Sequence, residues 1–457
     1  MSVSPEANRA MSEVGPGSLL GSLLRWYWQP IGGTAEIERG AVVPRRLLGE
    51  DLVLYRDRAG HLGLLQRSCP HRGTDLSCGW VEERGVRCCY HGWLFDETGT
   101  CKAQPYEDAA DSLGRFRDRV RAIAYPVREH RGLVWAWMGS GEPPPIPNWE
   151  LFTWGNGFVQ VVTSSVPCNW LQAQENSIDP VHFEWLHETW TRRLAGDEGY
   201  VARRHVRLMF EEHHFGFVYG REREEDPTKS LQVTHNTGDR PRGGQGRGVF
   251  LWPNALYAIA HIEWRVPIDD ENTLSVGWFF DPVPRDRRPF VQGSIPTWTA
   301  PVFDATGRPI TSHIMNQDFA AWIGQGRLAA RDVEHLGRSD RGVLLARRRL
   351  LEEAEVVKRG GSPKSVLPPN MDMSASKSRG VTASVELPVD GREYLREGPS
   401  RARYEVELAR TRSLYGSAFP FLAGQPNEVA AAYAEAMGIS SADLCARVGV
   451  GESRALP

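Results

Sequence analysis

The chain has 457 residues, of which 41% are hydrophobic and 24% are charged, and its formal net charge is -3. This length exceeds one ordinary core and favours two or three domains. The composition excludes a disordered or fibrous chain, and the near-balance of charge gives no sign of a nucleic acid or a membrane surface as partner.

The N-terminal segment, residues 1–27, contains the apolar run SLLGSLLRWYW. It lacks a basic leader, a small-residue cleavage site and the roughly twenty apolar residues of a membrane span. Cysteine usage points to a reducing compartment, because the seven cysteines are an odd number and five of them crowd into residues 69–101. Such crowding favours a metal site over a disulfide framework. We therefore expect a cytoplasmic protein without a membrane span.

Residues 28–140 show short strand-like runs separated by glycine turns, among them RRLLGEDLVLYRD, HLGLLQRS and RGLVWAWMG. This pattern predicts a small all-β domain. The stretch that follows, residues 141–150, contains three consecutive prolines, which cannot continue a helix or a central strand. It predicts a stiff linker and a domain boundary.

Beyond the linker, residues 151–457 mix helical and strand-like patterns, which predicts a larger domain and an α+β fold overall. Two stretches, 238–248 and 358–380, are typical of long loops. The predicted helices cover about 168–190, 312–330 and 340–358, and the predicted strands include HFGFVYGRE, LYAIAHIEWRVPI and TLSVGWFFDPV.

The first candidate metal site lies in the small domain. Cys69-Pro-His71 and Cys88-Cys-Tyr-His91 each supply one thiolate and one imidazole. A zinc finger usually takes its cysteines from one knuckle and its histidines from a helix. A Rieske-type [2Fe-2S] cluster instead needs two thiolates on one iron and two neutral imidazoles on the other. The mixed pairs favour the Rieske cluster, with a closed zinc ribbon as the alternative.

The second candidate site lies in the larger domain, where Asp179, His182 and His187 occur close together. Histidines five residues apart do not share one face of a regular helix, so both reach one metal only where the helix is distorted. Asp179 precedes a proline and also fits a helix N-cap. Asp318 lies in an apolar helical run, where a carboxylate is costly to bury unless it is paired or ligating; a solvent-exposed aspartate is the alternative. Two imidazoles and a carboxylate form the facial triad of catalytic Fe(II).

Together the two sites resemble the oxygenase component of the Rieske non-haem iron oxygenases, over nearly the whole chain. The match is carried by C-x-H…C-x-x-H followed by N-x-x-D-x-x-H-x4-H, here Asn176, Asp179, His182 and His187. Farther on, NQDFAAWIGQG and RDVEHLGRSDRGVLLARRRL resemble the phthalate dioxygenase branch.

The resemblance implies a Rieske domain followed by a catalytic domain with an antiparallel sheet covered by helices. Asp179 would accept hydrogen bonds from His182 and, across a subunit interface, from His91, and Asn176 is a second candidate for this region. Thr74 and Tyr90 stand where respiratory Rieske proteins carry bracing cysteines, so no disulfide is expected there. The implied ligands are Cys69 and Cys88 on one cluster iron, His71 and His91 on the other, and His182, His187 and Asp318 on the mononuclear Fe(II).

The resemblance also implies the partners. A separate reductase with flavin and ferredoxin-type centres would pass electrons from NAD(P)H, and the subunits would form trimers or hexamers. We expect hydroxylation or dihydroxylation of a small aromatic, possibly carboxylated, substrate with O2, and Arg207, Arg221 and Arg247 are candidates to hold a carboxylate. Oxidative O- or N-demethylation on the same machinery is the alternative, and a Rieske electron carrier is a more distant one.

Overall fold

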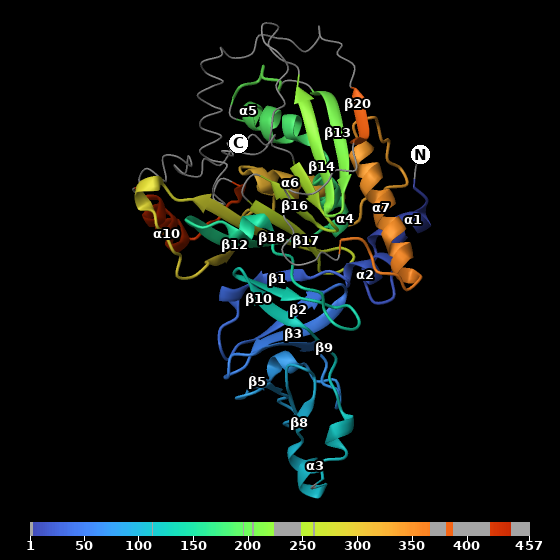
Figure 1. Cartoon of the computed structure of the whole chain (residues 1–457), viewed down its shortest axis with the longest axis vertical. Helices are drawn as coiled ribbons and strands as arrows, with labels where there is room; N and C mark the ends of the chain where they lie inside the picture. Colours follow the sequence, from blue (N-terminus) through green and yellow to red (C-terminus); the bar gives the residue numbers. More distant parts are fainter. Residues whose placement is uncertain are drawn as a thin grey trace.

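The structure is a computed structural model that describes residues 3–111, 113–194, 196–202, 205–223, 248–258, 261–365, 381–386 and 421–439. The molecule is elongated, with small sheets at one end and a large sheet flanked by helices at the other (Figure 1). The predicted loop 238–248 lies outside the described residues except for Gly248, and so does the part of the second predicted loop from 366 to 380.

The narrow end is built mainly of β-strands, as predicted, in two four-stranded sheets with the orders β2-β3-β4-β9 and β5-β6-β7-β8; the short helix α3 lies at its tip (Figure 1). The β2–β3 turn shows why the chain folds here: Leu48 and Gly49 both have positive φ, as a two-residue hairpin of matching twist requires. Their N–H groups donate to the carbonyls of Pro267 and Ile268, which fastens this domain to the larger one. The strands are β2 (Val42–Leu47), β3 (Glu50–Arg56), β4 (Leu62–Gln66), β5 (Trp80–Val81), β6 (Val86–Arg87), β7 (Leu94–Phe95), β8 (Cys101–Ala103) and β9 (Ala124–Tyr125).

A three-stranded sheet joins the two ends of the molecule. It has the order β1 (Gln29–Gly33), β11 (Leu133–Ala136), β10 (Val127–His130). Trp135 of β11 packs edge to face on Trp264 of the large sheet, with ring centroids 5.3 Å apart, so one apolar core runs through the junction. The proline-rich stretch has no regular structure before η4 (Glu150–Thr153).

The large sheet has nine strands among the described residues, in the order β19-β12-β18-β17-β16-β15-β14-β13-β20. All of its neighbours pair antiparallel, as expected, except β19, which pairs parallel with β12 and makes the sheet mixed. The strands are β12 (Gly157–Val166), β13 (His205–His213), β14 (Gly216–Arg223), β15 (Gly248–Leu251), β16 (Ala255–Ala258), β17 (His261–Pro267), β18 (Thr273–Pro282), β19 (Thr297–Thr299) and β20 (Val381–Glu386).

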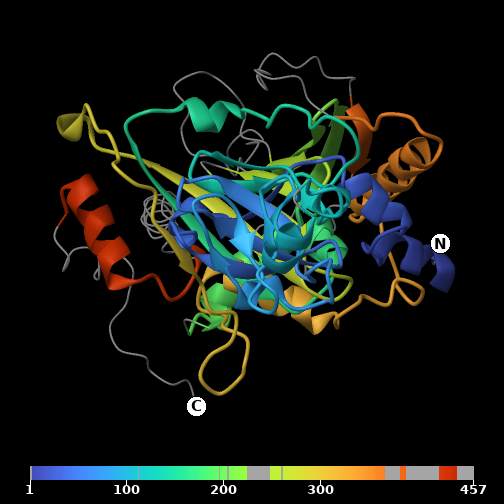
Figure 2. The same ribbon diagram turned by 90° about the horizontal axis from the view of Figure 1, so that it is seen from below.

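Helices flank the large sheet, with α7 and the N-terminal helices on one side and α10 on the opposite side (Figure 2). The predicted helix over 168–190 is two helices with a break between them, and the second, η5, is a π-helix. No described helix is long and apolar enough to cross a membrane. The helices are α1 (Pro5–Ser12), α2 (Leu19–Leu24), α3 (Pro105–Ala110), α4 (Trp170–Asn176), η5 (Phe183–Trp190), α5 (Thr191–Leu194), α6 (Ile314–Gly324), α7 (Arg341–Lys358) and α10 (Asn427–Met437), with 3-10 turns η1 (Thr34–Glu36), η2 (Leu76–Cys78), η3 (Arg117–Arg119) and η6 (Arg285–Arg287).

Candidate active site

Two loops with the same backbone pattern carry the four predicted cluster ligands. In each loop a glycine N–H donates to the carbonyl of the cysteine four residues earlier, Gly73 to Cys69 at 2.9 Å and Gly92 to Cys88 at 3.1 Å. Both glycines have positive φ, +78° and +73°, a conformation that glycine adopts without steric cost. The two loops therefore make the same tight turn, and each turn holds one cysteine and one histidine.

The four side chains divide into a buried and an outer pair. Cys69 and Cys88 are each 2% exposed, whereas His91 is exposed and its ring centroid lies 4.4 Å from that of the half-buried His71. Burial and the nearby Cys88 raise the pKa of the Cys69 thiol to about 12, so a bound metal would displace its proton. Burial and the neighbouring His91 lower the pKa of His71, which keeps the imidazole neutral as a ligand requires. This donor set fits a cluster with an inner thiolate iron and an outer imidazole iron.

No disulfide links the two loops. The cysteines of the described residues, Cys445 lying outside them, are all free thiols.

The second predicted site is also assembled. One ligand atom each from His182, His187 and Asp318 lie within 4.8 Å of one another. Asp318 Oδ1 is 3.2 Å from His187 Nε2 and 3.7 Å from His182 Nε2. The Asp318 side chain is only 11% exposed, so the alternative of a solvent-facing aspartate is wrong. Two imidazoles and one carboxylate, buried and converging, fit Fe(II) with open coordination positions.

The π-helix explains how two histidines five residues apart face one point. An α-helix has about 3.6 residues per turn, which sends such residues to different faces. A π-helix closes its hydrogen bonds from i to i+5, so its turn is wider and positions five apart come together. His182 is the N-cap of η5 and His187 lies inside it. The expected distortion is therefore present, and π-bulges of this kind are frequent at functional sites.

Two amide side chains lie within hydrogen-bond distance of the candidate metal ligands. Asn176, at the end of α4, donates from Nδ2 to Asp318 Oδ1 at 3.2 Å, which places this predicted residue beside the metal site. Gln317 Oε1 lies 3.0 Å from His187 Nδ1. Sequence reasoning misses Gln317, because a glutamine beside a ligand is no metal donor and its partner is 130 residues away; its position next to Asp318 is the signal that could have found it.

Asp179 lies at the edge of the site. Its Oδ1 accepts the Val181 N–H at 2.9 Å in the turn before η5, but the N-cap of η5 is His182, so the interpretation of Asp179 as the N-cap is wrong. Its Oδ2 is 3.7 Å from His182 Nδ1, which is longer than a hydrogen bond. Burial acts to raise the pKa of this carboxyl, but the attraction of His182 and the backbone N–H groups outweigh it, and the pKa is lowered. The side chain remains 32% exposed in the single chain, so it is accessible to a further donor.

Of the three arginine candidates, Arg221 is held by the π-helix region. Its Nη1 donates to the Pro180 carbonyl at 3.1 Å and lies 3.5 Å from a Glu184 carboxylate oxygen. Its guanidinium also lies 4.5 Å from the centre of the Phe183 ring. Arg221 thus ties β14 to the start of η5. Arg207 is half-buried on β13, and Arg247 lies outside the described residues.

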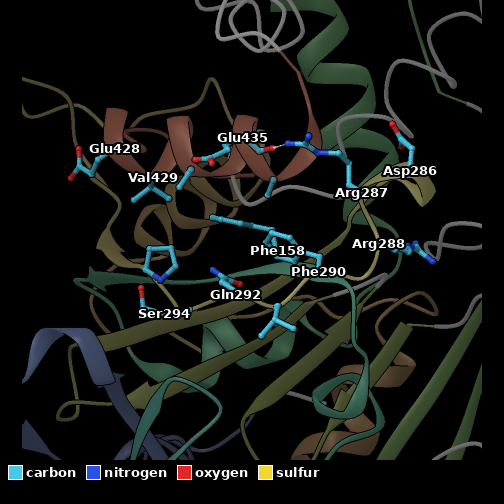
Figure 3. Close-up of a pocket in the computed structure, with 15 residues that line it drawn as sticks. Phe158, Asp286, Arg287, Arg288, Phe290, Gln292, Ser294, Glu428, Val429 and Glu435 are labelled. Carbon is cyan, nitrogen blue, oxygen red and sulfur yellow. Dashed lines mark hydrogen bonds between the residues drawn. The ribbon is translucent and has the colours of Figure 1, made fainter.

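A groove of about 650 Å³ lies away from both metal sites, between α10 and residues 286–296. Figure 3 shows Arg287 reaching from one wall to the backbone of Glu435 on the other, where it donates a hydrogen bond. None of the predicted metal ligands lines this groove. Its position gives it no part in the chemistry of the metal sites.

Comparison with known sequences agrees with the metal sites. Residues 27–120 match the family described as the Rieske [2Fe-2S] domain. The chain is 47% identical over 439 residues to the 5,5'-dehydrodivanillate O-demethylase oxygenase subunit of Sphingobium sp., covering 96% of this chain and 98% of that relative. It is 35% identical to the phenoxybenzoate dioxygenase subunit alpha of Ectopseudomonas oleovorans (78% and 87% covered). Identity to the phthalate 4,5-dioxygenase oxygenase subunit of Pseudomonas putida is 29% (86% and 94% covered).

Solved structures share the fold at low identity. The oxygenase in an oxygenase–ferredoxin complex of carbazole 1,9a-dioxygenase superposes with a TM-score of 0.50 at 19% identity, covering 77% of this chain and 95% of that chain. Pseudomonas putida CBB5 NdmA with caffeine superposes with a TM-score of 0.51 at 18% identity, covering 75% and 94%. These likenesses show that the fold is shared.

Proposed function

This chain belongs to the Rieske non-haem iron oxygenases, as an oxygenase subunit, and we propose that it catalyses oxidative O-demethylation of a methoxylated aromatic compound. The observation that carries the proposal is the 47% identity, over almost all of both chains, to a relative that is named as an O-demethylase. Two relatives named as aromatic dioxygenases that match most of the chain stand at 35% and 29%, and a third is 40% identical over only 39% of this chain. Ring hydroxylation, the first expectation from the sequence, therefore becomes the second candidate, and demethylation the first.

The chain carries a Rieske [2Fe-2S] cluster and a mononuclear site. The zinc-ribbon and the electron-carrier alternatives are therefore abandoned. We assign the cluster ligands as Cys69, His71, Cys88 and His91, and the mononuclear ligands as His182, His187 and Asp318. The Fe(II) in the latter site supplies activation of O2 with electrons from the cluster. NAD(P)H would provide these electrons through a separate reductase, and the solved complex of a similar oxygenase with a ferredoxin supports a ferredoxin-type donor.

The proposed reaction balances as follows. One oxygen atom of O2 is inserted into a C–H bond of the methoxy group, and the other is reduced to water by two electrons and two protons. The resulting hydroxymethyl ether breaks its C–O bond to give a phenol and formaldehyde. The chain holds its ligands for this step on η5 and α6, where burial limits competing water. Asn176 keeps the Asp318 carboxylate oriented through its hydrogen bond.

Formaldehyde release tests demethylation directly. Dithionite-reduced protein, mixed once with O2 and a methoxylated aromatic acid, is expected to release one formaldehyde per phenol formed. This single-turnover design needs no reductase, so an unidentified partner does not affect it. A product that gains one or two hydroxyl groups on the ring and keeps its methyl group would contradict demethylation and favour the ring-hydroxylating alternative.

We propose further that the chains form a ring-shaped trimer, or a hexamer of two trimers. The strand β5, which lies between the two cluster loops in the sequence, is at the narrow end of the molecule, whereas α6 is in the wide end (Figure 1), so a trimer would allow the cluster of one chain to face the mononuclear site of its neighbour. Tyr90, whose ring contacts that of His91, is 55% exposed, and Trp80 of the same domain is 46% exposed, as expected of a surface covered in an assembly. Light scattering is expected to give three or six chains per particle; a monomer that turns over at full rate would contradict the assembly.

A further inference from the structure

We infer that Gln317 is a positioning residue that determines which ring nitrogen of His187 faces the metal. The two nitrogens of His187 have different neighbours: Nδ1 lies 3.0 Å from Gln317 Oε1, and Nε2 lies 3.2 Å from Asp318 Oδ1. The His187 side chain is 4% exposed and Gln317 is 2% exposed. A hydrogen bond buried in this way is stronger than one in water.

The orientation of the Gln317 amide follows from its other contacts. Its nitrogen lies 3.0 Å from the carbonyl oxygen of Thr311 and 2.7 Å from the hydroxyl of Thr191. A backbone carbonyl only accepts hydrogen bonds, so the amide nitrogen must face it. Turning the amide over would bring two acceptor oxygens together at Thr311. The Thr311 carbonyl therefore keeps Oε1 on the side of His187.

The amide orientation in turn sets the tautomer of His187. Because Oε1 can only accept, the hydrogen of a neutral His187 ring must be on Nδ1, and Nε2 keeps its lone pair for a metal. His182 differs, since its Nδ1 has no hydrogen-bond partner among the described residues and Asp179 Oδ2 is 3.7 Å away. His187 is therefore oriented by the fold of a single chain, whereas His182 is not.

The inference rests on the proposed mononuclear site and adds a residue that binds neither metal nor substrate. A partner that fixes a ligating imidazole typically changes metal affinity by about 10- to 100-fold when it is removed. Thr191 offers a matched control, because it also contacts the Gln317 amide but lies on the nitrogen side. Without the Thr191 hydroxyl, the Thr311 carbonyl would still orient the amide.

The test is a cobalt(II) titration of full-length protein whose mononuclear iron has been removed by a chelator and whose cluster is intact. Gln317→Leu is expected to weaken cobalt binding by about 10- to 100-fold and to change the ligand-field absorption. Thr191→Val is expected to bind cobalt almost as the wild type does. The Rieske absorption of each variant, which arises in the other domain, serves as the folding control.

The possible results distinguish a failure of the proposed Gln317 role from a failure of the proposed metal site. Wild-type affinity in Gln317→Leu, or an equal loss in Gln317→Leu and Thr191→Val, would overturn the role of Gln317. Undiminished cobalt binding in His187→Ala would instead overturn the metal site. Should the leucine variant not fold, nitrogen-15 spectra of histidine-labelled wild-type protein decide: the resonances lost in His187→Ala must show the hydrogen on Nδ1, and a hydrogen on Nε2 would overturn the inference.

Discussion

Replacement of Asp318 by alanine is expected to remove the mononuclear iron, leave the Rieske cluster in place and abolish turnover. The Asp318 carboxylate lies within 3.2 Å and 3.7 Å of the two histidine nitrogens, so its loss leaves a site of two imidazoles that no longer forms the facial triad. Turnover should fall below about 1% of the wild-type rate, since removing even an outer partner of a ligand costs roughly 10- to 100-fold. Metal analysis and substrate turnover measure the two effects.

Asp332→Ala is the matched control for this substitution, because Asp332 is an exposed aspartate of the same domain. It should keep full iron content and full activity. An Asp318→Ala protein that retains the wild-type iron content, or that still turns over substrate at more than a small fraction of the wild-type rate, would remove Asp318 from the proposed ligand set.

Replacement of Asp179 by asparagine is expected to leave both metal centres bound and to stop electrons from reaching the mononuclear iron. Asparagine keeps an oxygen that can accept the Val181 N–H, as aspartate does. It loses the negative charge and the second acceptor oxygen, which face His182 and, in the proposed trimer, His91 of the neighbouring chain. Coupled turnover should therefore fall by about 100-fold, at the upper end of the cost of losing such a partner.

The measurement is the rate at which the reduced cluster is reoxidised when O2 and substrate are added, together with iron and sulfide content. Asp179→Ala provides the comparison, because it also removes the acceptor for the Val181 N–H and should cost about 1 kcal/mol of stability. If Asp179→Asn is fully active and only Asp179→Ala fails, the hydrogen bond to Val181 alone explains the residue and the bridge between the two centres is wrong.

The cluster loops could be predicted from sequence because everything they need is local. Each ligand pair lies within four residues, and a glycine follows each pair at the position where the chain turns with positive φ. The cluster loops were therefore predictable from the short-range spacing of their cysteines, histidines and glycines. The hairpin between β2 and β3 was not predicted, because RRLLGEDLVLYRD was interpreted as one strand-like run, although the chain turns within it at Leu48 and Gly49.

The catalytic site was only partly predictable. His182 and His187 could be identified, but the π-helix that brings them together appeared only as a required distortion, because sequence periodicity does not specify a wider turn. Asp318 was found through its apolar helical surroundings and the family resemblance. Gln317 was not found at all, since its role depends on the Thr311 carbonyl and on His187, contacts that tertiary folding creates.

The pairing of distant strands and the choice of substrate could not be predicted from the sequence pattern. The parallel pairing of β19 with β12 joins segments more than 130 residues apart and makes an otherwise antiparallel sheet mixed. Hydroxylation and demethylation share the cluster, the iron ligands and the fold, so no motif separates them. Arg221, a candidate to hold a substrate carboxylate, instead contacts Pro180 and Glu184, an outcome that depends on how η5 packs on β14.

The presence of two different iron centres in one chain is tested most directly by iron, zinc and acid-labile sulfide analysis of anaerobically purified protein, with a low-temperature EPR spectrum after dithionite reduction. A two-iron cluster and one mononuclear site predict about three irons and two sulfides per chain with a Rieske-type signal. Zinc without sulfide would contradict the cluster at Cys69, His71, Cys88 and His91, and two irons with no third in fully loaded protein would contradict the site at His182, His187 and Asp318.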